Sequence, residues 1–314
     1  MSIPLPDTSP ALVALDWGTS SLRAYLLDGS GRMIESAREP KGIMQVEAGG
    51  FAKVFDEITR AWLGRCPGLP AIAAGMVGSA QGWVEAPYLP CPASPDDLAG
   101  ALVQAPGRRL WIVPGVLQPG DRPDVMRGEE TQVAGALALR PELAADARIV
   151  LPGTHSKWAR VCNGRIESFT TYMTGELFAV LRDCSILGRT AGSGPGRDGD
   201  AAFLRGVDAA RGADGIAPLL FSARALVLTG GIAPEDALDY LSGLLIGDEL
   251  RSALAEAGAA PRLIGEPALA ARYARALARF GLDGADTIPD TAAAGLWRIA
   301  AAAGIVKTTR TEVA

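Results

Sequence analysis

Three short turns of small residues are the part of the sequence whose residue types best suit chemistry on a phosphate group. Each follows an apolar run that predicts a strand, ending at Asp16, Leu151 or Leu228, and the turns read WGTSS, PGTHS and TGGIA. Glycine lets the backbone approach an anion closely, and Thr and Ser add hydroxyl donors beside exposed N–H groups. Together the turns predict a phosphate-binding site, although any one of them alone could be an ordinary β-turn that caps its own backbone.

The carboxylate of Asp16 stands directly before the first of these turns. A carboxylate repels bare phosphate, but Mg²⁺ between the two makes the arrangement favourable, because nucleotide-bound Mg²⁺ takes only one or two carboxylates. Asp16 is therefore the candidate metal ligand. The sequence has no GxxxxGK[ST] loop, no GxGxxG after a strand and no HRD or DFG pair, which excludes the commoner nucleotide-binding classes.

Composition narrows the class of protein further. The 314 residues, 48% of them apolar, suffice for two lobes or one large α/β unit. A net charge of -5 provides no basic field for a nucleic-acid backbone. The N-terminal MSIPLPDTSP has neither the basic nor the apolar region of a signal peptide, and no apolar run is long enough to span a bilayer. We expect a cytoplasmic protein that binds neither nucleic acid nor membrane.

Cysteine and histidine usage argues against a zinc site. The four cysteines, Cys66, Cys91, Cys162 and Cys184, show no CxxC spacing, and His155 is the single histidine. This pattern is typical of reduced thiols in a cytosol.

The elements that must position the turns follow the same order in both halves of the chain. A strand, a polar turn, a strand, a tight hairpin turn and a third strand are predicted at residues 11–16, 22–27 and 32–38, and again at 148–151, 157–162 and 165–171. The repeated order predicts an internal structural duplication.

Periodicity and turn signals predict the remaining elements. Helices are expected at 51–63, at 129–139 with acids in the first turn, from Pro234 onward and at 291–303; buried strands are expected at 69–77 and 225–228. The Pro- and Gly-rich stretch 83–124 predicts loops and short strands that shape a surface pocket, and Gly188–Gly199 predicts a mobile loop.

The order of the three turns resembles the actin-like ATPase superfamily, which includes sugar kinases, Hsp70 and actin. The strings MRGEETQ (126–132), LPGTHSKW (151–158), TGELF (174–178) and SGLLIGDEL (242–250) are similar to the 2-dehydro-3-deoxygalactonokinase family, over about residues 11–297. The resemblance implies an α/β, two-lobed actin-like ATPase (ribonuclease H-like) fold, each lobe a mixed five-stranded sheet flanked by helices, closing on ATP.

The resemblance also implies how the chain is divided. Residues 1–143 form an N-terminal lobe with the first phosphate motif and the sugar-acid pocket. Residues 144–290 form a C-terminal lobe with the second phosphate motif and the adenosine motif. Residues 291–314 form a C-terminal helix that packs back on the first lobe.

The activity implied is transfer of the ATP γ-phosphate to the 6-hydroxyl of 2-dehydro-3-deoxy-D-galactonate, with ATP and Mg²⁺ as cofactors and a homodimer as a possible assembly. The alternatives are an actin- or Hsp70-like ATPase, a phosphohydrolase on the same fold, and a kinase for another 2-keto-3-deoxy sugar acid.

The resemblance assigns nucleotide contacts to three groups of residues. These are Gly18, Thr19 and Ser20 in the first phosphate motif with Arg23 just after it, Gly153, Thr154, His155, Ser156 and Lys157 in the second, and Gly230, Gly231 and Ile232 in the adenosine motif. We expect His155 to be a hydrogen-bonding or structural residue rather than a base, since no second histidine or acid is near it in sequence. Lys157 either contacts the phosphates or extends outward from the following strand.

Phosphoryl transfer to an alcohol needs a base for the hydroxyl proton. In related sugar kinases an aspartate before the second phosphate motif serves, and Glu129 and Glu130 stand in that place, with Asp16 as the third catalytic candidate. The spacing to Gly135 favours Glu130, and both acids could instead simply complement the helix dipole.

The carboxylate of the acceptor requires a cation or a set of backbone N–H groups. Candidates in the first lobe are Lys41, Gly42, Gly75, Met76, Gly78, Ser79, Trp83, Tyr88 and Arg127. Arg127 is the preferred one, because it adjoins the base candidates and a guanidinium can hold a carboxylate bidentately. The ordinary alternatives are an exposed Lys41, a core Met76, packing aromatics and a surface ion pair between Arg127 and Glu129 or Glu130.

Overall fold

The computed structural model describes residues 9–307 except 193, 195, 257 and 290. Most of the N-terminal MSIPLPDTSP and two positions of the expected loop Gly188–Gly199 lie outside the described residues. The chain divides into two compact units, which are described separately. Unit 1 comprises Met1–Asp146, Arg160–Phe169 and Asp290–Ala314, and unit 2 comprises Ala147–Ala159 and Thr170–Pro289.

Unit 1 is built on a six-stranded sheet of order β3-β2-β1-β4-β7-β6. Its strands are β1 (Pro10–Trp17), β2 (Leu22–Asp28), β3 (Met33–Glu39), β4 (Ala71–Ala74), β6 (Val103–Gln104) and β7 (Leu110–Ile112). β1 pairs antiparallel with β2 and parallel with β4, and β4 pairs parallel with β7. A smaller sheet contains β5 (Tyr88–Pro90), β8 (Gly115–Gln118) and β9 (Asp124–Met126).

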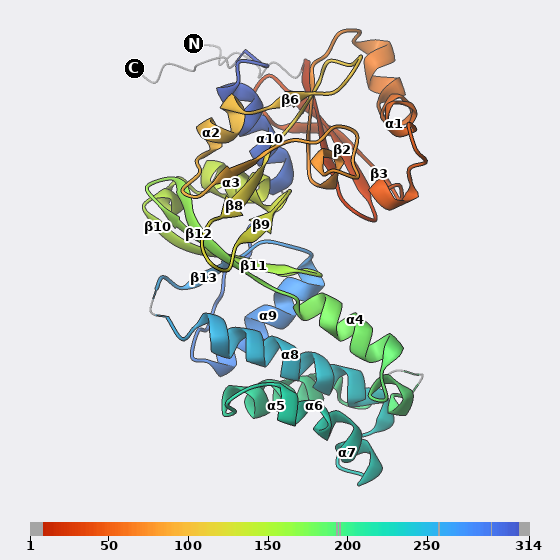
Figure 1. Cartoon of the computed structure of the whole chain (residues 1–314), viewed down its shortest axis with the longest axis vertical. Coiled ribbons are helices and arrows are strands. Elements are labelled where there is room, and N and C mark those ends of the chain that lie inside the picture. Colours follow the sequence, from red (N-terminus) through yellow and green to blue (C-terminus); the bar gives the residue numbers. More distant parts are fainter. Residues whose placement is uncertain (1–8, 193, 195, 257, 290, 308–314) are drawn as a thin grey trace, which may run out of the picture. The chain divides into compact units, whose positions relative to one another are not determined.

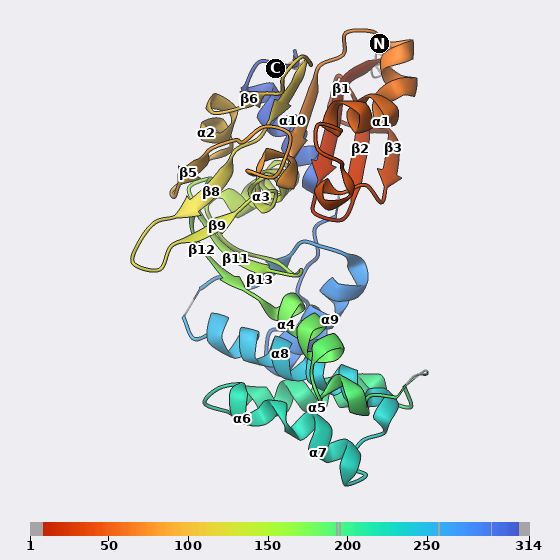
Figure 2. The same cartoon turned by 45° about the vertical axis from the view of Figure 1, so that its right-hand side comes forward.

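Helices cover both faces of the large sheet, as Figure 2 shows for α1 and α10. The helices on the sheet are α1 (Phe51–Arg65) and α10 (Thr291–Ala302), and α2 (Pro95–Gly100) and α3 (Glu129–Leu139) pack on α10. The apolar face of α1 packs with Trp17 and Trp83 in an aromatic cluster whose ring centroids lie 5.5 to 6.5 Å apart. Burial of this cluster fixes the carboxyl end of β1, where the first small-residue turn begins.

Unit 2 contains helices and residues of a four-stranded sheet of order β12-β11-β10-β13. The strands are β10 (Asp146–Leu151), β11 (Ser156–Cys162), β12 (Arg165–Tyr172) and β13 (Pro261–Leu263), and β10 pairs parallel with β13. The helices are α4 (Thr174–Cys184), α5 (Gly199–Arg211), α6 (Ala217–Leu220), α7 (Ser222–Leu228), α8 (Ala237–Ala253) and α9 (Pro267–Arg279). Helices α5 and α8 lie side by side (Figure 1) because glycines at their crossing admit the opposite backbone.

The repeated strand order predicted from the sequence is present in both halves. β1, β2 and β3 form one antiparallel meander, and β10, β11 and β12 follow the same spatial order. In each half the first strand then pairs parallel with a later strand, β4 or β13. Parallel neighbours end at the same edge of a sheet, so each half gathers two strand-end turns at one edge.

Two predictions about strands are wrong. Residues 225–228 belong to helix α7, because a short apolar run without alternation suits a helix as well as a strand and here continues the helical turn from Ser222.

The sheets have six, four and three strands in the described part of the chain, where the resemblance implied five in each lobe. The strand expected at 69–77 is shorter, since Ala71–Ala74 is followed by a 3₁₀ turn at Met76–Gly78.

Within the described residues, no helix is long and apolar enough to cross a membrane. The four cysteines are free.

Helices α3 and α10 approach so closely that glycine is required on both. A Cβ at Gly135 would lie 1.8 Å from the carbonyl oxygen of Thr291, and one at Gly295 would lie 1.9 Å from that of Thr131. This backbone contact sets the position of α3, and therefore of the two glutamates at its first turn.

Replacing Gly135 with alanine should lower the free energy of unfolding by about 1–3 kcal/mol, because the added methyl group cannot fit without separating the two helices. Urea unfolding followed by circular dichroism measures this. The matched control is Gly64→Ala in α1, where no atom lies within 4 Å of the added Cβ; it should stabilise the protein by roughly 0.5–1 kcal/mol. Equal effects of the two substitutions would contradict the close crossing.

Candidate active site

One edge of the large sheet in unit 1 brings together three of the predicted site segments. Asp16 in β1 is paired with Ala74 in β4, so both strands end at this edge. A Cβ on Gly75 would lie 2.8 Å from the carbonyl oxygen of Trp17. A Cβ on Gly128 would lie 3.2 Å from Cα of Gly75. The end of β1, the Gly75 turn and the start of α3 are thus in direct backbone contact.

The first small-residue turn presents unused backbone donors. The N–H of Gly18 donates to the carbonyl of Ser21 at 3.0 Å and closes the turn. Thr19 and Ser20 are exposed, and their N–H groups donate to no acceptor among the described residues. Gly42 lies against this turn, because a Cβ there would come within 2.2 Å of the Thr19 carbonyl oxygen. Free N–H groups at a tight turn are suited to binding an anion.

Asp16 lies at the base of the turn, and the residue as a whole is half-buried. Burial raises its pKa, while the positive charge of Arg23, its cross-strand partner, acts in the opposite direction. A divalent cation would strengthen ionisation of this carboxyl group. In the described residues no group of three or more His, Cys, Asp or Glu side chains could enclose a metal ion. A carboxylate is a hard oxygen donor, so Asp16 is suited to be a single protein ligand of a cation that phosphate and water hold mainly.

The two glutamates at the start of α3 differ in accessibility. Glu130 is fully buried; its carboxyl oxygens accept from the Gly128 N–H at 2.6 Å and from the Thr131 hydroxyl at 2.9 Å. Burial, with a smaller effect from the neighbouring charge of Glu129, raises the pKa of Glu130 to about 8. Glu129 is only half-buried, and its carboxylate accepts from the backbone N–H of Arg127 at 3.0 Å.

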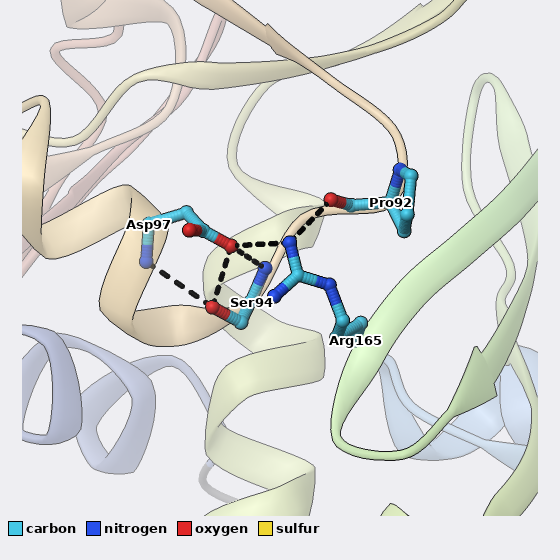
Figure 3. A network of polar contacts seen from close by, with 4 residues as sticks. All are labelled: Pro92, Ser94, Asp97 and Arg165. Carbon is cyan, nitrogen blue, oxygen red and sulfur yellow. Dashed lines mark hydrogen bonds and ion pairs between the residues drawn. The ribbon is translucent and has the colours of Figure 1, made fainter.

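Apolar side chains explain the burial of Glu130. Leu98, Val133 and Ile166 line the small space beside it, together with the loop that precedes α2. Figure 3 shows the polar network that holds this loop: the guanidinium of Arg165 donates to the Pro92 carbonyl at 2.7 Å and to the Asp97 carboxylate at 2.8 Å. The hydroxyl of Ser94 also donates to Asp97, at 2.6 Å, and caps α2.

Arg127 carries a buried guanidinium with one unpaired nitrogen. Only 9% of the residue is exposed. Its Nη2 donates to the Ala86 carbonyl at 2.8 Å, and the guanidinium carbon lies 4.2 Å from the centre of the Tyr88 ring. Nη1 has no hydrogen-bond partner, and it lies 3.0 Å from where a Cβ on Gly78 would be. The surface ion pair considered for Arg127 is not formed, because its side chain is directed at the Gly75–Ser79 turn.

The other substrate candidates of unit 1 have mainly structural contacts. The ammonium group of Lys41 donates to Glu57 at 2.9 Å, and its carbonyl accepts from the indole of Trp17 at 2.9 Å. Trp83 packs in the aromatic cluster. Met76 is half-buried, and its carbonyl accepts from the hydroxyl of Ser79 at 2.8 Å. These contacts shape the Gly75–Ser79 turn. Among the described residues that were candidates for this pocket, Arg127 is the buried cation that keeps an unpaired donor.

In unit 2 the second small-residue turn packs against the first turn of α4. A Cβ on Gly175 would lie 2.4 Å from the carbonyl oxygen of Gly153, and the N–H of Glu176 donates to the Thr154 carbonyl at 3.0 Å. At Gly153 itself, no atom lies within 4 Å of the corresponding Cβ position. The turn is thus supported on one side and open on the other.

His155 and Lys157 have defined partners in this turn. The imidazole Nε2 of His155 is in very short contact with the carboxylate of Glu176, and both side chains are about half exposed. Lys157 is 95% buried rather than extended into solvent, and its ammonium group donates to the Thr171 hydroxyl at 2.7 Å. The outward orientation considered for Lys157 is therefore wrong.

The expected adenosine motif has a different local structure from the one predicted. Gly230 and Gly231 follow helix α7 rather than a strand. The N–H of Gly231 donates to the Leu226 carbonyl at 2.7 Å, and Gly230 has φ of 72°, so the two glycines end a helix. Nucleotide contact by Gly230, Gly231 and Ile232 stays a prediction that rests on the resemblance.

Gly265 is a further candidate for the site that was not predicted from the sequence. It follows β13, whose parallel neighbour β10 leads into Gly153, and a Cβ on Gly265 would lie 3.5 Å from the Pro152 carbonyl oxygen. Its position in unit 2 corresponds to that of Gly75 in unit 1. The available signal was an apolar run, Leu263-Ile264, followed by glycine and by Pro267 at the first position of a helix.

Comparison with known proteins agrees with this architecture. A family model described as 2-keto-3-deoxy-galactonokinase matches residues 16–299. An Escherichia coli (strain K12) 2-dehydro-3-deoxygalactonokinase is 38% identical over 284 residues, covering 89% of this chain and 94% of that protein. A crystal structure of a Sinorhizobium meliloti protein assigned the same activity has a TM-score of 0.85 at 37% identity, covering 93% of this chain and 98% of that one.

A more distant structure shares the fold. The activator of 2-hydroxyisocaproyl-CoA dehydratase from Clostridium difficile, with bound ADPNP, has a TM-score of 0.50 at 16% identity and covers 93% of this chain and 95% of its own.

The raised pKa of Glu130 makes stability depend on pH. Its folded-state pKa of about 8 lies above the ordinary value of 4.5, so the folded state binds the extra proton and stability falls as pH rises between these values. In Glu130→Gln this contribution is absent. Urea unfolding at pH 5.5 and 7.5 measures this. As the pH rises, the free energy of unfolding of the variant should increase relative to that of the wild type by on the order of 1 kcal/mol per pH unit. Glu142→Gln, an exposed glutamate, is the control and should follow the wild type. Parallel pH profiles of Glu130→Gln and the wild type would contradict the buried, neutral carboxyl group.

Proposed function

The chain belongs to the 2-keto-3-deoxy-galactonokinase family and is an ATP-dependent sugar-acid kinase, and we propose that it phosphorylates the 6-hydroxyl of 2-dehydro-3-deoxy-D-galactonate. The observation that carries the proposal is the unpaired Nη1 of the buried Arg127, beside the Gly75–Ser79 turn and two residues from Glu129. A buried cation with a free donor calls for an anionic group, and a sugar acid supplies one.

Arg127 is proposed to hold the carboxylate of the acceptor. Its Nη2 and the face of its guanidinium are already fixed by Ala86 and Tyr88, so the side chain loses little conformational freedom when a ligand binds. Nη1 remains for the carboxylate. Glycine is required at position 78, because a Cβ there would lie 3.0 Å from Nη1 and 2.8 Å from Cγ2 of Ile112.

Glu129 is proposed to accept the hydroxyl proton. A general base must be within hydrogen-bond reach of the group that it deprotonates, and Glu129 is accessible whereas Glu130 is fully buried. The hydroxyl oxygen forms a bond to the γ-phosphorus while its proton passes to the Glu129 carboxylate, and the bond between that phosphorus and the leaving oxygen of ADP breaks. Glu130 supports this arrangement by binding the Gly128 N–H.

The nucleotide is proposed to bind through backbone donors. In unit 1 these are the free N–H groups of Thr19 and Ser20, with Asp16 as the ligand of Mg²⁺. Bound Mg²⁺ would neutralise charge on the phosphate oxygens. In unit 2 the Gly153–His155 turn and Gly265 present the corresponding strand ends.

A coupled ADP-release assay tests the function directly. ATP consumption should be strongly stimulated by 2-dehydro-3-deoxy-D-galactonate, because the proposed site holds the carboxylate of the acceptor beside the base. Reactions without acceptor are the control. High ATP hydrolysis that no sugar acid changes would favour an ATPase or a phosphohydrolase instead.

Glu129→Gln should lower kcat by two or more orders of magnitude with the dissociation constant for ATP little changed, since the amide cannot accept the proton. Steady-state kinetics and nucleotide titration measure the two quantities. Glu130→Gln is the matched comparison, and its kcat should fall less. If Glu130→Gln abolishes turnover while Glu129→Gln retains it, the roles of the two glutamates are the reverse of those proposed.

A further inference from the structure

A buried carboxyl group in unit 2 collects three hydrogen bonds from three different segments. Glu249, in α8, is 2% exposed. Its Oε1 accepts from the indole N–H of Trp158 at 2.7 Å, and its Oε2 accepts from the Tyr273 hydroxyl at 2.7 Å. The Thr174 hydroxyl donates to the same Oε2 in a very short contact. Such a network is costly to break, because any unpaired member would remain buried.

The network reaches the second small-residue turn through one further bond. The hydroxyls of Ser156 and Tyr273 are 2.9 Å apart. Because Tyr273 gives its single proton to Glu249, Ser156 must be the donor between these two hydroxyls. Ser156 begins β11 and is completely buried, so it ties the last residue of the turn to the carboxyl group.

Thr174 connects the opposite side of the turn. It is the first residue of α4, and the next two residues contact the turn directly: Gly175 packs on the Gly153 carbonyl, and the N–H of Glu176 donates to the Thr154 carbonyl at 3.0 Å. The Glu249 carboxylate therefore fixes both the segment that continues the turn and the helix on which the turn rests.

Three of the four sequence strings that identify the family supply this network. LPGTHSKW contributes Ser156 and Trp158, TGELF contributes Thr174, and SGLLIGDEL contributes Glu249. Trp158, Thr174 and Glu249 are assigned no role in the chemistry above, and the Ser156 side chain, which the resemblance places among the nucleotide contacts, is completely buried in this network. The three strings are far apart in sequence, and the hydrogen bonds to Glu249 and Tyr273 bring their polar side chains together.

We propose that Glu249 is the positioning residue of the nucleotide site, acting through Tyr273 and Thr174 to hold the Gly153–His155 turn. This inference rests on the proposed function, since it presumes that the turn binds ATP. Glu249 lies beneath the turn and contacts no substrate. Loss of either connection should leave the fold intact and loosen the backbone donors that face the nucleotide.

The test uses the full chain with Tyr273→Phe and Thr174→Val, each of which removes one connecting hydroxyl with little change in shape. Each variant should raise the KM for ATP and the dissociation constant for a non-hydrolysable ATP analogue about tenfold, which corresponds to about 1.4 kcal/mol. The KM for the sugar acid should stay within about twofold, because the acceptor is bound by unit 1 residues. Tyr172→Phe is the matched control; its hydroxyl donates to Ser252 at 3.2 Å outside the network, and it should behave as the wild type.

The possible outcomes separate this inference from the proposed function. Unchanged ATP binding in both variants overturns the positioning role, even if their melting temperatures fall, because the network would then be only structural. An equal rise in the KM for ATP and for the sugar acid also overturns it. If the wild type itself fails to bind the ATP analogue, the proposed function fails, and the positioning role with it.

Discussion

The close contact of backbone with backbone at the carboxyl edge of the sheet is the constraint on which the candidate site depends. Gly75 lies between the Trp17 carbonyl and Gly128. Any larger residue at position 75 would force these two segments apart. Through this contact the metal-ligand candidate on β1, the Gly75–Ser79 turn after β4 and the glutamates on α3 occupy one edge. A side chain at either glycine would move the proposed base away from the first small-residue turn, whatever residues surrounded it.

In unit 2 the small-residue turn is held by a glycine contact and also by a buried polar network. Its second turn also rests on a glycine contact, between Gly175 and Gly153, but a buried polar network stands behind it. Glu249 provides acceptors for donors that arrive from β11, α4 and α9. Burial raises the pKa of Glu249, and the hydrogen bonds from Thr174 and the other donors lower it in part. The turn in unit 1 is thus held by close backbone contacts, whereas the turn in unit 2 is held by such a contact and by buried hydrogen bonds.

The elements that could be predicted from the sequence are those with local signals. The bounds of helix α3 follow from its acidic first turn and the proline after it, and the opening meander follows from alternation and the Asp28–Gly31 turn, where the Asp28 carboxylate binds Ser30 and Arg32. Residues 225–228 carry no such periodicity, so the strand prediction there is wrong. The contact of Arg127 with Ala86 spans 41 positions of the chain, and burial of Glu130 depends on Ile166. Neither is encoded in a local pattern.

The place of α10 in the chain has a consequence for biosynthesis. This helix packs into the groove that Gly135 opens on α3, and it is grouped with unit 1, yet the whole of unit 2 is translated before it. On the ribosome, the glutamate-bearing helix therefore waits for its partner until about the last residues of α10 have emerged. The unit that begins first is completed last, and in a nascent chain that has not reached Thr291 the face of α3 that holds Thr131 and Gly135 lacks its partner helix.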